Sequence, residues 1–142
     1  MRHTFTNPQR CVAGTIGEPG ERAFFIQARS DNRVVSVALE KAQVQAVANR
    51  LEVMIAEVRK SNPLIAIQSL PVDDAPLDTP VDEEFQVGAI SLAWDEDQQL
   101  ITLELYELEE DEEDAEGDVL EINFSLGVAS SFINRSKALV NA

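Results

Sequence analysis

The chain has 142 residues, 44% of them hydrophobic, which is enough for one compact domain but cramped for two. Its formal net charge of −15 is unevenly spread: residues 1–60 hold nine Lys and Arg against six Asp and Glu, and residues 61–142 hold two against twenty. The acidic second half argues against a nucleic-acid surface there, and the lack of a run of about 18 apolar residues argues against a membrane-spanning helix. With a single Cys and no N-terminal apolar stretch of signal-peptide length, we expect a cytoplasmic protein.

The first half of the chain predicts three strands followed by a helix. Residues 9–16, 21–29 and 33–39 are rich in β-branched, aromatic or alternating apolar residues, and turn-forming residues separate them. Residues 40–60 repeat apolar side chains at three- and four-residue steps, which predicts an amphipathic helix. We expect the N-terminus around His3 to be frayed.

The second half predicts the same order of elements after a linker. Residues 61–83 contain Pro71, Pro76 and Pro80 among several acids, and we expect residues 71–84 to be too polar to order themselves. Strands are expected at residues 85–94, 100–108 and 119–124. Ser125 is a suitable N-cap for a helix that runs to about Asn141.

These patterns predict an α+β fold of two βββα units, with largely antiparallel sheets and two packed helices. The units would be pseudo-repeat halves, residues 9–60 and 84–142, joined by the acidic, Pro-rich residues 61–83 within a single domain of residues 1–142. At an offset of 85 residues, Asn49-Arg50 corresponds to Asn134-Arg135. Because the identity is low, two similar units that arose by chance remain the alternative.

The acidic run at residues 109–118 has a partial calcium-loop spacing. Glu112, Asp114, Glu116 and Asp118 place oxygen atoms at positions one, three, five and seven of such a loop. Position twelve, however, is Asn123 rather than the usual glutamate, and the flanking segments are expected strands instead of helices. A solvated hairpin loop is therefore the favoured interpretation, with the calcium site as the alternative.

No other segment carries the residues of a catalytic or cofactor site. Cys11 lies in an expected strand of small and apolar residues, so we expect a buried structural thiol. With this one Cys and with His3 as the one histidine, we expect no zinc site and no Ser–His–Asp triad. The glycines at residues 14–20 precede a strand, which favours a hairpin turn over a phosphate-binding loop. We therefore expect no cofactor.

Four residues are candidates for an interaction surface. Arg22, Arg29 and Arg33 surround one expected hairpin, where they form a small anion-binding face or offset acids of the same chain or of a second copy. Trp94 precedes the acidic turn that begins at Asp95, and it is either a core anchor or a platform for a ligand.

Residues 10–29, 35–44 and 82–95 together resemble an actinobacterial family of uncharacterised proteins defined as a domain of unknown function. The resemblance covers nearly the whole chain. It implies genes close to that of the cysteine ligase of mycothiol synthesis, and it implies no catalytic residues. Members of that family continue into a Cys-rich, zinc-ribbon-like tail, a motif that these residues do not contain. The order of elements is also similar to that of whirly-type and Pur-type folds, which bind single-stranded nucleic acid.

The leading hypothesis is a non-enzymatic binding or adaptor module with an acidic interaction surface. Its partner would be a protein with a basic surface or a second copy of the chain. An accessory protein or enzyme of mycothiol-linked thiol metabolism is the alternative, so enzymatic activity stays open. Binding of single-stranded nucleic acid is the third hypothesis, and the acidic second half opposes it.

Overall fold

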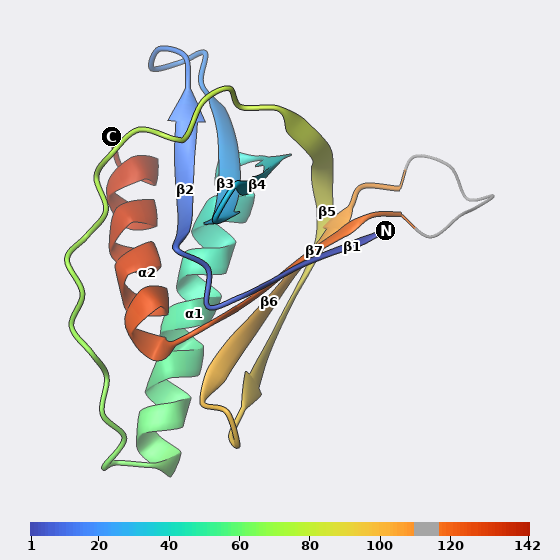
Figure 1. Cartoon of the computed structure of the whole chain (residues 1–142). Helices are drawn as coiled ribbons and strands as arrows, with labels where there is room; N and C mark the ends of the chain where they lie inside the picture. Colours follow the sequence, from blue (N-terminus) through green and yellow to red (C-terminus); the bar gives the residue numbers. More distant parts are fainter. Residues whose placement is uncertain (110–116) are drawn as a thin grey trace.

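The computed structural model describes residues 1–109 and 117–142, which form an α+β fold, as expected (Figure 1). The described strands are β1 (Arg2–Thr6), β2 (Arg10–Ile16), β3 (Ala23–Ser30), β4 (Arg33–Leu39), β5 (Glu83–Asp95), β6 (Leu100–Glu107) and β7 (Val119–Phe124). The helices are α1 (Lys41–Ser61) and α2 (Leu126–Val140). The elements expected within residues 9–60 and 84–142 are therefore present.

The strands form one mixed sheet in the order β1-β7-β6-β5-β4-β3-β2, not a set of largely antiparallel sheets. Hairpins join β2 to β3, β3 to β4 and β5 to β6, and β6 also pairs antiparallel with β7. The pairs β1–β7 and β4–β5 are parallel. Parallel pairs need long connections, and here α1 and residues 62–82 return the chain to start β5 beside β4.

The expectation of a frayed N-terminus was wrong, because β1 forms an edge strand of the sheet. Its residues pair in register with β7, from Arg2 opposite Val119 onwards. Phe5 is buried in the core, and Arg2 donates a hydrogen bond of 2.7 Å to Glu104 and another to Glu121. Five residues are too few for a clear apolar period, and every partner of β1 lies far along the chain.

The sheet is strongly curved, and the reason lies in the connection between its two edges. β1 and β2 lie at opposite ends of the strand order, yet residues 7–9 alone join them. The guanidinium of Arg33, at the start of β4, lies 4.0 Å from the ring centroid of Phe5 in β1. It also donates a hydrogen bond to Thr4 O. The two ends of the sheet thus approach each other around the core.

The two helices pack together and share one core with the strands. In α1 the apolar stripe expected from the sequence is buried, including Val44, Val47 and Leu51. Glu40 and Gln43 form a capping box at its N-terminus. Ser125 caps α2 as expected, because its Oγ accepts a hydrogen bond from the backbone N–H of Val128 at 3.2 Å.

Residues 62–82, here called the strap, are ordered without forming a helix or strand. The expectation that residues 71–84 are too polar to order themselves was wrong, because two largely buried arginines bind the strap. Arg10 donates to Asp73 Oδ2 (2.7 Å) and to Ala75 O (2.8 Å), and Arg135 donates to Asp73 O and Ala75 O (2.7 Å each). Figure 1 shows the strap (green) running along α2 and then across β2 and β3 to β5.

The strap also covers the outer face of the sheet over β2 and β3. Leu77 forms a small second cluster with Val12 and Phe25. Gly14 makes room for it, since a Cβ atom at that position would lie 2.5 Å from Leu77 Cγ. Both faces of the sheet are therefore covered at β2 and β3, which explains why these two strands are apolar on both faces.

The element order is the same in the two expected halves: three strands and then a helix. β1 stands outside that pattern. A duplication of βββα units stays a prediction, because a shared order of elements alone does not establish common descent.

Candidate functional site

A groove runs between α1 and one edge of β5. It consists of two pockets of about 300 and 200 Å³ that share Met54 and Glu57. We call it the α1–β5 groove, and its lining residues are Asn49, Arg50, Val53, Met54, Glu57, Val58, Ser61, Leu92, Trp94 and Glu96.

The groove exists because β5 outruns its partner β4. The two strands pair only where Ser36 lies opposite Glu83 and Ala38 opposite Gln86. β4 ends at Leu39, whereas β5 continues to Asp95. In the part of the chain that the structure describes, no strand pairs with this edge of β5 beyond Gln86. An unpaired edge leaves backbone donors and acceptors available.

The hydrogen-bond pattern of β6 shows which residues of β5 face that edge. Leu108 donates its backbone N–H to Gln86 O at 2.7 Å, so every second residue back along β6 also faces β5. Glu104 is one of these, and it lies opposite Ser91. Ser91 therefore directs its backbone N–H and C=O groups towards β6. The residues that alternate with it along β5 direct theirs away from β6, and these are Ile90, Leu92 and Trp94. Arg50 agrees with this assignment, because its Nη1 donates to Ile90 O at 3.2 Å.

The floor of the groove is apolar and its far end is acidic. Val53 is 58% exposed, and Met54, Leu92 and Trp94 are half-buried against the core. Trp94 Nε1 donates to Glu96 Oε2 at 2.9 Å, which fixes the indole beside the acidic turn. Trp94, singled out from the sequence, thus lies at a site formed together with α1.

A second, wider depression of about 810 Å³ lies on the same side of β5, at the N-terminus of α1. Gln43 Nε2 donates to Val87 O (3.0 Å) and Gly88 O (3.1 Å), so a helix side chain caps the edge here. Gly88 permits the close approach of Leu108, the residue after β6, since a Cβ atom there would lie 3.0 Å from Leu108 Cα. The remaining lining residues include three acids: Glu40, Glu107 and Glu109.

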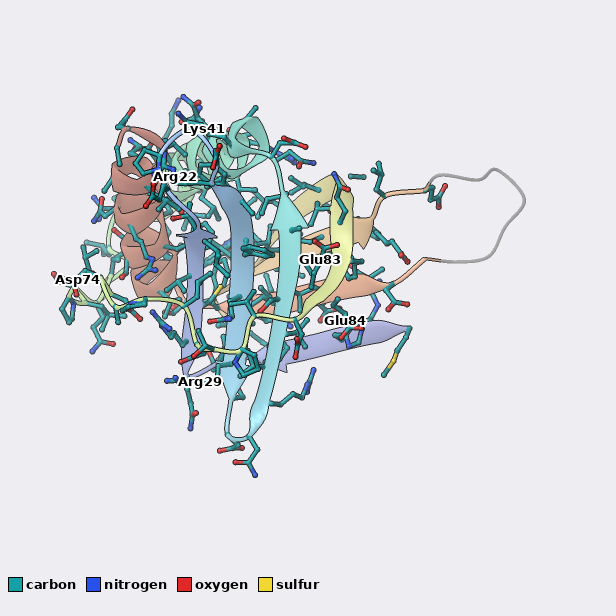
Figure 2. All side chains as sticks on the ribbon, turned by 90° about the horizontal axis from the view of Figure 1, so that it is seen from above. Arg22, Arg29, Lys41, Asp74, Glu83 and Glu84 are labelled. Carbon is teal, nitrogen blue, oxygen red and sulfur yellow. The ribbon has the colours of Figure 1, made fainter. Side chains whose placement is uncertain are left out.

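The three arginines predicted to surround one hairpin do not share one environment. Figure 2 shows Arg22 and Arg29 towards opposite ends of β3. Arg29 donates to Asp78 of the strap at 3.0 Å, and Arg22 lies 5.3 Å from the ring centroid of Phe24. Arg33 stacks on Phe5, as described above. Among the described contacts of these three arginines only that of Arg29 involves an acid, so the offsetting of acids stays a prediction for Arg22 and Arg33.

The predicted calcium ligands Glu112, Asp114 and Glu116 lie outside the described residues. Asp118 is described, and it lies near two other possible ligands, His3 and Glu84, with the ligand atoms of all three within 4.8 Å of one another. Asp118 Oδ1 accepts a hydrogen bond from the Met1 ammonium at 3.1 Å, and Oδ2 lies 3.4 Å from His3 Nε2. The ammonium and then the imidazole hold the pKa of Asp118 below its usual range.

Cys11 is buried in β2, as expected. Desolvation raises the pKa of its thiol to about 12, so the thiolate is not formed at neutral pH. The geometry therefore assigns this residue to packing.

The comparisons identify the family. A family model described as "Protein of unknown function (DUF3090)" matches residues 3–142. The chain belongs to this family. The resemblance noted in the sequence is thereby confirmed for a domain of unknown function, whereas the actinobacterial origin and the gene neighbourhood stay predictions. Searches of curated proteins and of solved structures returned no match.

The family assignment names no ligand for DUF3090 members, so the site is defined by geometry alone. None of the described helices combines the length and apolarity that crossing a bilayer requires.

The sequence singled out Trp94 through its acidic neighbours, but it missed Val53, Met54 and Leu92. Met54 belongs to the apolar stripe, which predicts a core position for it, and nothing local shows that β5 extends beyond β4.

Proposed function

We propose that this DUF3090 protein is a non-enzymatic binding module that captures an extended, basic segment of a partner protein in the α1–β5 groove. The observation that carries the proposal is the edge of β5 beside α1, with which no described strand pairs beyond Gln86. Leu92 and Trp94 offer two backbone N–H groups and two carbonyl groups there, which an added strand pairs with. A cytoplasmic location fits this role and is part of the proposal.

The side chains around the edge suit the alternation of an added strand. Every second residue of an extended segment points to the same face, about 7 Å apart. The pocket at Leu92 and Val53 and the pocket at Trp94 and Val58 are both apolar at the floor. Apolar residues at alternate positions of the segment would fill them, and Arg50 on Ile90 O marks the end of the available edge.

Charge favours a basic segment. Glu57 and Glu96 line the groove, and Asp95 and Asp97 flank it in the adjoining turn. Arg50 also lines the groove, where it donates to Ile90 O, but these four acids outnumber its single positive charge. A Lys-rich or Arg-rich segment gains attraction from the acids at the far end and is steered by the net charge of −15.

A second copy of the chain fits the groove less well. Edge-to-edge pairing of two β5 strands brings two highly acidic molecules together, and like charges across an interface are unfavourable. Arg29 and Arg33, which were to contact the acidic half of a neighbour, are engaged by Asp78 and by Phe5 and Thr4. The described residues thus support a heterologous basic partner.

The alternatives gain less support. Stacking of bases on Phe24 and Phe25 would need exposed rings, and both side chains are 8% exposed. A role in thiol metabolism rests on the resemblance to a family with that gene neighbourhood. No described group shows the shielded, perturbed carboxyl in a deep cleft that an acid–base enzyme uses.

The probe that tests the proposal is a fluorescein-labelled octapeptide of alternating Lys and Val, followed by fluorescence anisotropy. We expect saturable binding at about 20 mM NaCl and at least tenfold weaker binding near 300 mM, because acids at the groove are screened. Val53→Lys adds a like charge at an exposed position of the groove and should weaken binding at least tenfold. The matched control Val34→Lys changes a 40% exposed valine on β4 and should leave affinity unchanged.

Two further peptides separate strand addition from general attraction. The same octapeptide with methylated backbone amides cannot donate to the edge, and we expect it to lose binding. An octapeptide of alternating Glu and Val should not bind. Equal binding of the methylated peptide, or an unaltered affinity of the Val53→Lys variant, would show that the groove is not the site.

A further inference from the structure

We infer that His3, Glu84 and Asp118 form a binding site for a divalent transition-metal ion. The three side chains come from separate parts of the sheet: β1, β5 and the residue before β7. One ligand atom from each lies within 4.8 Å of the other two. In Figure 2, Glu84 at the start of β5 lies beside β1.

The distance between His3 and Asp118 suits a shared cation better than a direct hydrogen bond. His3 Nε2 and Asp118 Oδ2 are 3.4 Å apart, whereas charge-assisted hydrogen bonds are roughly 2.7–2.9 Å long. Two ligands of a tetrahedral ion with bonds of about 2.1 Å are separated by roughly 3.4 Å. The existing spacing therefore matches two ligands of one ion without movement of the backbone.

The surroundings hold two of the ligands in place. The His3 side chain is only 11% exposed, and its backbone is fixed by the β1–β7 ladder. The two carboxylate oxygens of Asp118 have different neighbours: Oδ1 faces the Met1 ammonium and Oδ2 faces His3. The backbone N–H of Asp118 also donates to Glu107 Oε1 at 2.9 Å. Such outer hydrogen bonds orient ligands in metal sites.

The ligand set indicates the class of metal. One imidazole and two carboxylates suit Zn²⁺, Mn²⁺, Fe²⁺ or Co²⁺, whereas Ca²⁺ and Mg²⁺ prefer oxygen ligands alone. Glu84 is exposed, so a fourth position would be open to water or to an exogenous ligand. The sequence predicted no zinc site because it contains one Cys and one His, but this reasoning left out carboxylate ligands from distant strands.

The test uses the fact that the chain contains one histidine. Zn²⁺ is titrated into the full, chelator-treated protein while the ¹⁵N resonances of the imidazole are recorded. We expect one equivalent to shift the Nε2 resonance of His3, and Co²⁺ to give visible d–d bands of a low-coordinate site. Glu84→Gln and Asp118→Asn should each weaken Zn²⁺ binding at least tenfold. Asp97→Asn, in the exposed β5–β6 turn, should not weaken it.

Zn²⁺ binding that leaves the His3 resonance unchanged would overturn the inference, because the ion would then be held by other acids. Equal affinities of wild type, Glu84→Gln and Asp118→Asn would overturn it as well. The result does not depend on the α1–β5 groove, since peptide binding by the Asp118→Asn variant should equal that of wild type.

Discussion

At the scale of single residues, the arginines of this acidic protein hold the strap on the fold. Arg10 is 8% exposed and Arg135 is 11% exposed as side chains, and both contact Asp73. The hydrogen bond from Arg10 holds the pKa of Asp73 below its usual range, and the same bond raises the pKa of Arg10. Burial lowers the pKa of Arg135, which has backbone carbonyls as its main acceptors. Buried guanidinium groups of this kind are costly to leave without partners.

Asp73→Asn should therefore destabilise the protein by about 2 kcal/mol at pH 7, because two buried arginines lose a charged acceptor. Since the pKa of Asp73 is lowered by folding, its stabilisation is present above the ordinary value of 3.8 and is lost as the pH falls below it. The difference in unfolding free energy between wild type and variant should thus shrink as the pH falls from about 4 towards 2. Urea unfolding at several pH values measures this difference.

The neighbouring Asp74 provides the control. It is exposed on the strap, where Figure 2 labels it, and Asp74→Asn should change stability by less than about 0.5 kcal/mol. If the difference in unfolding free energy between wild type and Asp73→Asn stays constant over the acidic range, Asp73 does not act through its charge.

At the scale of elements, the strap and α2 approach each other more closely than a side chain permits. A Cβ atom at Gly127 would lie 2.5 Å from Gln68 O, a backbone atom. The Ser131 hydroxyl donates to Pro71 O one turn further along the helix. The strap is thus fitted to one face of α2, and its position depends on a missing side chain as much as on the arginines.

Gly127→Ala should lower the free energy of unfolding by about 1–3 kcal/mol, because the strap must move to admit the methyl group. Helix propensity alone predicts the opposite sign, a gain of about 1 kcal/mol. Asn134→Ala, at an exposed position of the same helix, should stabilise slightly. Thermal unfolding of both variants compares the two effects, and a higher melting temperature for Gly127→Ala would contradict the close contact.

At the scale of the whole molecule, the net charge of −15 opposes the compact state, while ion pairs offset it locally. The described pairs gather around β1, the strap and the α1–α2 contact, as in Arg2–Glu121, Arg29–Asp78 and Lys137–Glu52. Such partly exposed pairs each contribute little. The excess of acids in the second half therefore dominates the long-range field.

Added salt should act in opposite directions on folding and on partner binding. Raising NaCl from about 10 to 300 mM screens the repulsion between acids, so the urea midpoint should increase. The same change should weaken binding of the Lys-Val octapeptide, as described above. A urea midpoint that falls with salt would show that the ion pairs outweigh the net repulsion.

Much of the fold could be predicted from the sequence because its signals are local. The apolar stripe of α1, the Ser125 cap and the alternation of β4 and β6 all depend on residues a few positions apart. The surroundings of the four predicted interaction residues could be predicted less well, because some of their contacts are with residues far along the chain. Trp94 lies in the groove, but Arg29 and Arg33 contact Asp78 and Phe5, which no local pattern indicates.

Local periodicity and charge thus determined which segments become helices and strands, except for β1, and which half is acidic. The tertiary structure alone decided that β1 joins β7, that the strap is ordered by Arg10 and Arg135, and that β5 outruns β4. It also decided that His3, Glu84 and Asp118 meet. Each of these depends on pairing between residues far apart in the chain, where sheet register and loop closure, rather than neighbouring side chains, choose the partners.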